Sequence, residues 1–228
     1  MQEKRSAKLY QYTACPFCWK VKAILDKLQI PFEEVEVEPM KKKELSFSKD
    51  YKKVPLFVDS DGTVVADSNE IMRYLDKRYA TKSLFSDSKR EKDLFDLSEK
   101  FAFALPPVIY KTLLGSWRAF AYISQVSSFP FWQKGFIRLF GSIVMFLVAK
   151  KKAKARGITD PDKHLHNLFV ALHPLIATMP GNQPEAGDYA VWGILRSVQE
   201  LPCFAAMQSH QEVLRWYNQV GQSLPEKK

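Results

Sequence analysis

The chain has 228 residues, a formal charge of +9 and a hydrophobic content of 46%. These values exclude a disordered or fibrous chain and suit one large or two small globular domains. The positive charge favours anionic ligands or an anionic membrane surface, and because no nucleic-acid-binding motif accompanies it we expect no nucleic acid partner.

The number of cysteines and the composition of the N-terminal residues indicate in which cellular compartment the protein is expected. Residues 1–8 are polar and charged, with no apolar run behind them, so we expect no signal peptide. The sequence contains three cysteines, Cys15, Cys18 and Cys203. In an unsecreted chain such a small number is typical of a reducing environment, where a C-x-x-C pair is more often catalytic than structural. We therefore expect a cytoplasmic protein.

The first 80 residues alternate predicted strands and helices. In chain order these are a strand over 9–13, a helix from residue 16 onward, a strand over 32–37, a short helix within 40–51, strands over 53–58 and 63–66, and a helix over 67–79. The turn signal at 59–62 makes the last two strands a hairpin. The order is therefore β-α-β-α-β-β-α.

The motif C-P-F-C lies where the first strand runs into the first helix. Pro16 suits the first helical position, which makes Cys15 the N-cap. There the sulfur faces unpaired N–H groups and the positive end of the helix dipole, and both lower the pKa of a cysteine. Cys18, one turn into the helix, is placed to resolve a mixed disulfide.

Other uses of the two cysteines are less consistent with the sequence. Structural zinc requires four clustered ligands, whereas the remaining candidates are one cysteine and four scattered histidines. Covalent haem attachment requires a histidine directly after Cys18, and Trp19 occupies that position. A purely buried pair of thiols is an alternative, but Pro16 at a helix start favours an activated thiol. We expect no metal ion.

The second half of the chain contains only helix signals. The predicted helices cover 86–125 with a break near Pro106 and Pro107, 132–156 with an end at Gly157, a segment that begins at Asp160, 188–198 and 211–220. The apolar run 139–149 is far shorter than the ~20 residues of a spanning helix. We expect it to be a buried helix, with peripheral membrane contact as the alternative because aromatic residues precede it and lysines follow it.

The order of elements, with C-P-F-C after the first strand and V-P before the third, resembles the thioredoxin-like domain of glutaredoxins and glutathione transferases. The resemblance implies an α/β thioredoxin-like N-terminal domain over 7–84 and an all-α C-terminal domain over 85–228, together a glutathione transferase fold. It also implies glutathione as cofactor. A cis Pro55 would let the backbone of Val54 pair with the tripeptide. Asp67 and Ser68 would hold its γ-glutamyl end, although ordinary helix capping also explains this pair.

Segments 9–18, 52–55, 67–68, 190–196 and 216–217 together resemble the type 2 prostaglandin E synthase family within this superfamily. The resemblance implies an isomerase that converts prostaglandin H endoperoxide, a small lipid, into prostaglandin E. Cys15 would act on the peroxide, Tyr12 would hydrogen-bond and orient this thiol, and Cys18 would support the site. The family's long N-terminal extension with its hydrophobic anchor is absent from this sequence, so we expect at most peripheral membrane contact.

Two other functions use the same residues. The first is a glutathione-dependent thiol–disulfide oxidoreductase or omega-like glutathione transferase, in which Cys15 attacks a disulfide substrate. The second is a non-enzymatic protein similar to chloride intracellular channel-like proteins, which also pair C-P-F-C with this fold, and haem or an iron-sulfur cluster would then be held by Cys15 with glutathione. The resemblance to the synthase family likewise implies binding of glutathione with haem.

The helical half poses two further questions. Its aromatic run could form a homodimer interface, although core packing is the simpler expectation; the residues are Trp117, Phe120, Tyr122, Phe129, Phe131 and Trp132. Residues 187–196 resemble the buried helix of glutathione transferases. Glu185 replaces the usual Ser or Thr of its capping box, so we expect an imperfect box and a structural role for Asp188.

Overall fold

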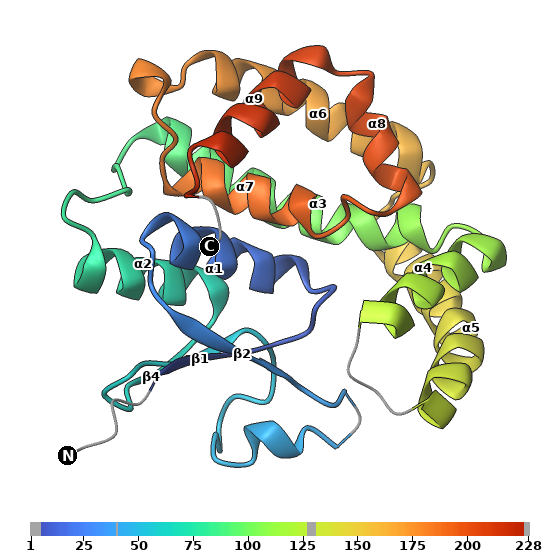
Figure 1. Ribbon diagram of the computed structural model, residues 1–228. Coiled ribbons are helices and arrows are strands. Elements are labelled where there is room, and N and C mark those ends of the chain that lie inside the picture. The colour runs from blue at the N-terminus through green and yellow to red at the C-terminus, as the bar shows by residue number, and fades with distance from the viewer. Residues whose placement is uncertain (1–5, 40, 127–130, 226–228) are drawn as a thin grey trace.

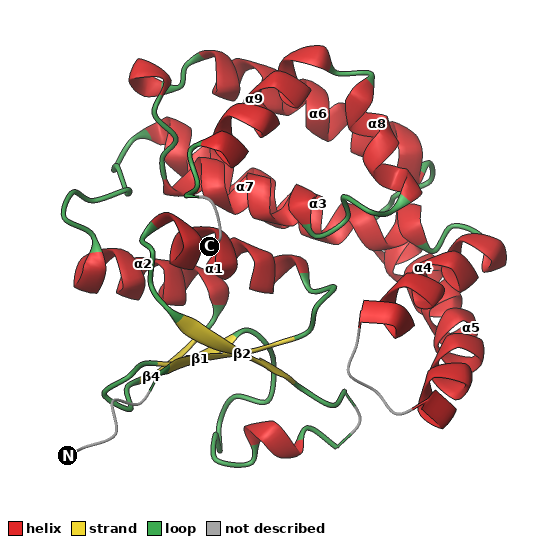
Figure 2. Cartoon of the chain, viewed as in Figure 1, coloured by secondary structure: helices red, strands yellow, loops and turns green. Residues whose placement is uncertain are grey.

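The computed structural model describes residues 6–39, 41–126 and 131–225, and the side chains of 122–139 and of residue 182 lie outside the description. Figure 1 shows a small sheet covered on one face by two helices, with further helices stacked above them. In Figure 2 the strands are confined to the N-terminal part of the chain, and the described C-terminal part is helical.

The N-terminal part follows the predicted order of elements. Its elements are β1 (Ala7–Gln11), α1 (Pro16–Lys27), β2 (Phe32–Glu36), the 3-10 turn η1 (Lys43–Leu45), β3 (Leu56–Val58), β4 (Val64–Ala66) and α2 (Ser68–Tyr79). The strand order is β2-β1-β3-β4, in which β1 and β2 are parallel and the other pairs are antiparallel. The parallel pair is connected through α1, as a βαβ unit requires.

The C-terminal part consists of helices. They are α3 (Lys89–Ile109), α4 (Leu113–Val126), α5 (Phe131–Ala155), α6 (Pro161–Ala177), α7 (Ala186–Arg196), α8 (Ala205–Gln208) and α9 (Gln211–Gln222), with the 3-10 turns η2 (Pro180–Asn182) and η3 (Pro202–Phe204). The chain passes from α2 to α3 between residues 79 and 89, so the predicted boundary at 84/85 falls in this connection. The division into two domains remains a prediction.

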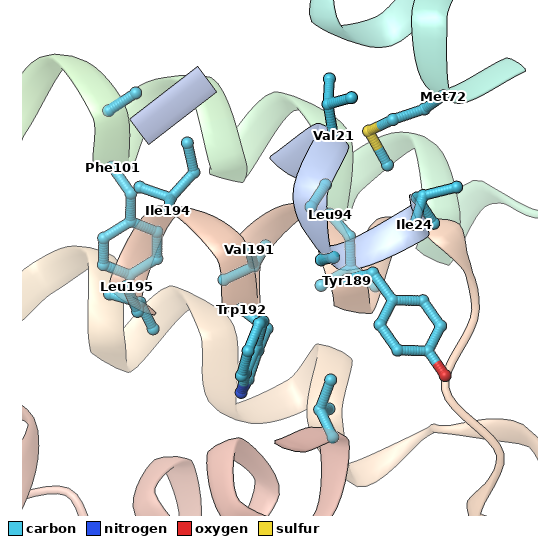
Figure 3. Packing of buried hydrophobic residues seen from close by; sticks show 14 of the residues in the cluster. Val21, Ile24, Met72, Leu94, Phe101, Tyr189, Val191, Trp192, Ile194 and Leu195 are labelled. Atoms are coloured by element: carbon cyan, nitrogen blue, oxygen red, sulfur yellow. The ribbon is translucent and has the colours of Figure 1, made fainter. Parts of the chain in front are cut away.

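One hydrophobic core joins the two parts of the chain. Side chains of α1, α2, α3 and α7 meet in it, as Figure 3 shows. A close approach occurs at Gly193 of α7, where a Cβ would lie 2.6 Å from the carbonyl oxygen of Trp19. Only glycine therefore lets α7 pack on the first turns of α1, the helix that is capped by Cys15 and contains Cys18.

Asp188 has the structural role that the sequence indicates. Its carboxylate is fully buried and accepts hydrogen bonds from Arg90 at 2.7 Å, from the indole N–H of Trp216 at 3.0 Å and from the backbone N–H of Glu185 at 2.9 Å. The side chain of Glu185 pairs with Arg90 at 2.9 Å. This network ties the start of α7 to α3 and α9.

Two element predictions differ from the structure. The helix predicted within 40–51 is reduced to η1, because local side chains bond its backbone: Glu44 accepts from the N–H of Glu38, and Lys52 donates to the carbonyl of Leu45. The break predicted near Pro106 and Pro107 lies a few residues further on, between Ile109 and Leu113. Helix α3 runs through both prolines to Ile109, since their missing N–H groups affect only its last turn.

The prediction that 139–149 forms a buried helix is wrong. The segment is helical, but four of its large apolar side chains are 43–58% exposed: Phe140, Ile143, Val144 and Leu147. The opposite side of α5 carries small residues, because α4 and α5 pack closely: a Cβ at Gly141 would lie 2.5 Å from the ring of Phe120. Within the described residues, no helix has the length and apolar character needed to cross a bilayer.

The aromatic run considered as a dimer interface is described only in part. Phe120 packs against Tyr110, with ring centroids 6.0 Å apart, and Trp117 is 37% exposed. Four of the six side chains lie outside the described ones: Tyr122, Phe129, Phe131 and Trp132. A homodimer remains a prediction.

Candidate active site

The sheet register brings the predicted site residues to one end of the sheet. Leu56 of β3 pairs with Tyr10 of β1 on one side and with Ala66 of β4 on the other. The residues that follow β1 and β4 and precede β3 therefore lie at the same end. These residues include Tyr12 and Cys15, Val54 and Pro55, and Asp67 and Ser68. The N-terminus of α1 points to this end as well.

Cys15 is the N-cap of α1, as the sequence predicts. Its backbone is extended (φ −82°, ψ 116°), Pro16 follows at the first helical position, and its carbonyl accepts from the N–H groups of Cys18 and Trp19 at 3.1 and 3.2 Å. The side chain is partly exposed. A hydrogen bond from the Cys18 thiol and the N–H groups of the first turn lower the pKa of Cys15, although burial opposes them.

Cys18 has the opposite character. It is fully buried, and burial raises its pKa well above the ordinary range of a cysteine. Both cysteines are free thiols. The pair therefore consists of one sulfur that ionises readily and a second that keeps its proton and donates it in a hydrogen bond to the first.

Tyr12 lies beside the two thiols. Its pKa is raised by burial and then by the charges of Cys15 and Cys18. The carbonyl of Tyr12 accepts the N–H of Cys15 at 2.9 Å, whereas the contacts of the described residues include no hydrogen bond from the Tyr12 hydroxyl to Cys15. The orienting role of this hydroxyl remains a prediction.

Val54 presents free backbone groups at this end of the sheet. The Val54–Pro55 peptide bond is cis, and Pro55 is buried at the entrance to β3. Among the described residues, neither the N–H nor the C=O of Val54 has a hydrogen-bond partner. The two groups can therefore pair with an extended peptide in the manner of an added strand.

Asp67 and Ser68 begin α2. Asp67 caps the helix, since its carboxylate accepts the N–H of Asn69 at 2.8 Å. Its φ of 71° is unusual for a residue other than glycine and costs of order 1–3 kcal/mol. Ser68 is buried, and its hydroxyl has no partner among the described residues. Capping is thus present, and the strained backbone and free hydroxyl are features of a binding site.

Glu36, at the end of β2, holds the loop before Cys15. Its carboxylate accepts from the backbone N–H and the hydroxyl of Thr13 at 3.0 and 2.9 Å, and from the side chain of Gln11 at 2.9 Å. Burial raises the pKa of Glu36. The sequence did not indicate this role, because Glu36 ends a strand with three acidic residues that resembles an ordinary solvated edge.

Two further residues near the site carry no sequence signal. Burial raises the pKa of Tyr51, and the charges of Asp67 and of the two thiols raise it further. Lys20 is fully buried and donates to the amide oxygen of Asn69 at 2.6 Å. Burial lowers the pKa of Lys20 to about 8.

The helical part supplies a wall of the site through Phe103. Its ring contacts that of Phe17 edge-on, with centroids 6.0 Å apart, and 44% of the side chain is exposed. The guanidinium of Arg156 lies 4.7 Å from the centroid of the same ring. An apolar surface with one cation above it therefore begins two residues after Cys15.

Comparison with known proteins agrees with this geometry. Residues 9–83 match the family described as glutathione S-transferase, N-terminal domain. The chain is 25% identical to prostaglandin E synthase 2 of Danio rerio over 93% of this chain and 69% of that protein, and 24% identical to prostaglandin E synthase 2 of Mus musculus over 96% and 70%. Residues 9–83 therefore resemble the N-terminal domain of glutathione S-transferases, and the chain over more than nine-tenths of its length is similar to prostaglandin E synthase 2.

Solved structures confirm the glutathione transferase fold. A glutathione transferase family member from Pseudomonas fluorescens Pf-5, with bound S-(propanoic acid)-glutathione, superimposes with a TM-score of 0.59 at 16% identity and covers 98% of this chain and 99% of its own. Glutathione S-transferase III in apo form gives 0.63 at 16% identity, with 98% and 100% covered. The predicted fold class, a thioredoxin-like part followed by a helical part, is therefore confirmed.

Proposed function

We propose that the chain is a glutathione-binding, thiol-dependent isomerase that converts prostaglandin H endoperoxide into prostaglandin E. The observation that carries the proposal is the state of Cys15: a partly exposed residue at a helix N-terminus, with a lowered pKa and a hydrogen bond from Cys18. The isomerase reaction is favoured over others because both curated relatives named above align over more than nine-tenths of this chain.

Glutathione is held, in this proposal, by the groups that the chain leaves unpaired. The backbone of Val54 pairs with the peptide of the cofactor, and Ser68 with the start of α2 receives its γ-glutamyl carboxylate. The structure of similar fold named above contains a bound glutathione derivative, which supports glutathione as the ligand.

The isomerisation requires no net oxidant. The O–O bond of the endoperoxide breaks and a proton leaves the adjoining ring carbon. The electrons of that C–H bond form the ketone, and the second oxygen takes up a proton as the hydroxyl. The Cys15 thiolate attacks the peroxide oxygen on that carbon, so that an S–O bond forms as the O–O bond breaks, and the thiolate leaves again when the ring proton is lost and the ketone forms. Phe17 and Phe103 line the apolar part of the substrate.

A thiol–disulfide exchange activity is the second candidate, and Cys18 favours it. A buried thiol one turn after the nucleophile, hydrogen-bonded to it, is the arrangement that resolves a mixed disulfide. In this reaction Cys15 forms a disulfide with the substrate sulfur and expels a thiolate, and glutathione or Cys18 releases Cys15 again.

The test compares the two reactions in the same preparation. Conversion of prostaglandin H2 is measured by chromatography and mass spectrometry, and reduction of a glutathione mixed disulfide by a coupled assay. We expect isomerase product from the wild-type protein, loss of at least about 1,000-fold in Cys15→Ser because the nucleophile is gone, and unchanged turnover in the matched control Cys203→Ser.

Each outcome decides between the candidates. Disulfide reduction without isomerase product would replace the first proposal by the second. Full activity of Cys15→Ser in both assays would refute the role of Cys15. An absorption band of haem in the purified protein, without turnover in either assay, would favour the non-enzymatic binding function instead.

A further inference from the structure

The lobe formed by α4 and α5 exposes an unusual amount of apolar surface. It stands at one end of the helical part, where the two helices pack mainly on each other (Figure 1). Seven of the twelve exposed large apolar residues among the described ones belong to it: Leu113, Leu114, Trp117, Phe140, Ile143, Val144 and Leu147. Such a concentration is typical of an interaction surface.

Helix α5 differs from an ordinary surface helix because its large apolar residues lie on the exposed side and not on the buried side. Its side toward α4 and α3 carries the small residues Gly141, Ser142, Ala149 and Ala153. Its exposed side carries large apolar residues at positions 140, 143, 144 and 147, which is the i, i+3, i+4, i+7 spacing of one helix face. An apolar medium or partner is therefore needed to cover the outer face.

The same face continues into a basic end. Positions 151 and 154 extend the spacing to i+11 and i+14, and the exposed residues there are Lys151 and Lys154, with Lys150 beside them. The surrounding sequence is strongly polarised. Residues 100–159 contain ten Lys and Arg and no Asp or Glu, whereas the other 168 residues contain 24 basic and 25 acidic side chains. The lobe and its surroundings thus carry the whole positive charge of the chain.

We propose that this face of α5 docks on an anionic lipid surface, with its apolar residues in the interface and its lysines on the headgroups. An interfacial helix with an apolar face and flanking lysines has this character. A second copy of the chain fits this face less well. In a symmetric dimer the same region of both copies meets, and residues 100–159 contain no carboxylate to pair with the lysines. Phosphate groups of lipids supply the missing negative charge.

Docking would also bring the candidate active site close to the bilayer. Arg156 follows directly after α5, and its guanidinium lies 4.7 Å from the ring of Phe103, which lines the site. The basic end of the docking face and the apolar wall of the site are therefore adjacent. This arrangement suits a substrate taken from a lipid phase, but the docking does not depend on the proposed reaction.

The test is flotation of the full chain with vesicles of phosphatidylcholine containing about one third phosphatidylserine, beside vesicles of phosphatidylcholine alone. We expect the fraction of wild-type protein that floats with the anionic vesicles to be at least tenfold higher than the fraction that floats with the neutral vesicles. The double variant Val144→Glu/Leu147→Glu should bind the anionic vesicles at least tenfold more weakly than the wild-type protein. Its matched control is Val170→Glu, because Val170 is 50% exposed on α6, outside the lobe, and Val144 and Leu147 are 53% and 58% exposed.

Charge is tested by a second pair of variants. Lys150→Gln/Lys151→Gln/Lys154→Gln should weaken anionic binding on the order of 100-fold, at about 1 kcal/mol for each lysine. Removal of three other exposed lysines, in Lys41→Gln/Lys43→Gln/Lys49→Gln, should have little effect. Circular dichroism verifies that each variant is folded.

Three results would overturn the proposal. They are equal flotation with neutral and anionic vesicles, wild-type binding by the folded Val144→Glu/Leu147→Glu variant, and a wild-type dimer in light scattering that this variant turns into a monomer. The last result would assign the face to a second copy of the chain.

Discussion

Cys15 and Cys18 lie one helical turn apart and differ in every property that controls thiol chemistry. Cys15 faces the open N–H groups of the first turn, whereas Cys18 is enclosed by the core. The pKa is consequently lowered at one sulfur and raised at the other. The difference arises from position along the helix, since the two side chains are chemically identical.

Alkylation measures this difference directly. We expect iodoacetamide to react with Cys15 along a pH profile below that of an ordinary cysteine, and activity to be lost as the pH falls through the pKa of Cys15, because the thiolate is the reactive form. Cys18→Ala removes the donor to this thiolate and should move the profile to higher pH. Mass spectrometry in a Cys203→Ala background gives the rates, and an unchanged profile in Cys18→Ala would contradict the assigned hydrogen bond.

Lys20 gives a second prediction at this scale. Its pKa is about 8 in the folded protein and ordinary in the unfolded chain, so between these values the unfolded state binds more protons and the free energy of unfolding rises with pH. We expect a gain of about 2 kcal/mol from roughly pH 7 to pH 9.5.

Urea unfolding of Lys20→Met checks the assignment. This variant keeps the length of the side chain without its charge, so the part of the pH dependence due to Lys20 should disappear. The matched control is Lys77→Met, which changes an exposed lysine of α2 and should retain the wild-type slope. The same slope in Lys20→Met as in wild type would show that another group titrates.

Helices and strands position these residues. The first helix is held from below by Glu36, through the loop that ends β1, and from above by α7, through the close contact at Gly193. Neither partner adjoins the cysteines in sequence. The geometry of the thiol pair therefore depends on how β2 and α7 pack against the elements around α1.

Gly193→Ala tests the contact between α7 and α1. A methyl group 2.6 Å from a backbone oxygen forces one helix to move, so we expect a loss of about 1–3 kcal/mol in the free energy of unfolding and slower alkylation of Cys15. Gly221→Ala is the matched control in α9, because its Cβ would meet Trp192 at an ordinary 3.5 Å. That variant should be neutral or stabilised by up to about 1 kcal/mol. Equal stability of the two variants would contradict the close packing.

At the scale of the whole molecule, the two parts of the chain share one core, and the charge is unevenly distributed over its surface. The shared core places Phe103 of the helical part against Phe17 beside the thiols. The uneven charge accompanies the apolar face of α5. The catalytic chemistry and the proposed lipid contact thus occupy neighbouring parts of the same surface.

Local patterns in the sequence were sufficient for the order of strands and helices in the N-terminal part, the N-cap position of Cys15 and the start of α2 at Asp67, and the fold class followed from the resemblance of that order and its motifs to glutathione transferases. Each of the first three depends on residues within a few positions of one another: a proline after a capping residue, an apolar repeat, a turn signal. The clamp by Glu36, the burial of Lys20 and the approach at Gly193 join residues that are distant in sequence. No local pattern marks them.

The face of α5 shows the same limit most clearly. Its sequence contains an apolar run with helical spacing, and that pattern alone is equally consistent with a helix buried in a core and a helix with its large residues outside. Only the packing of Gly141 against Phe120 decided which side turns inward. The sequence by itself determined most of the helices and strands and the N-cap position of Cys15; the tertiary structure decided which surfaces remained exposed, because burial depends on which elements meet in space.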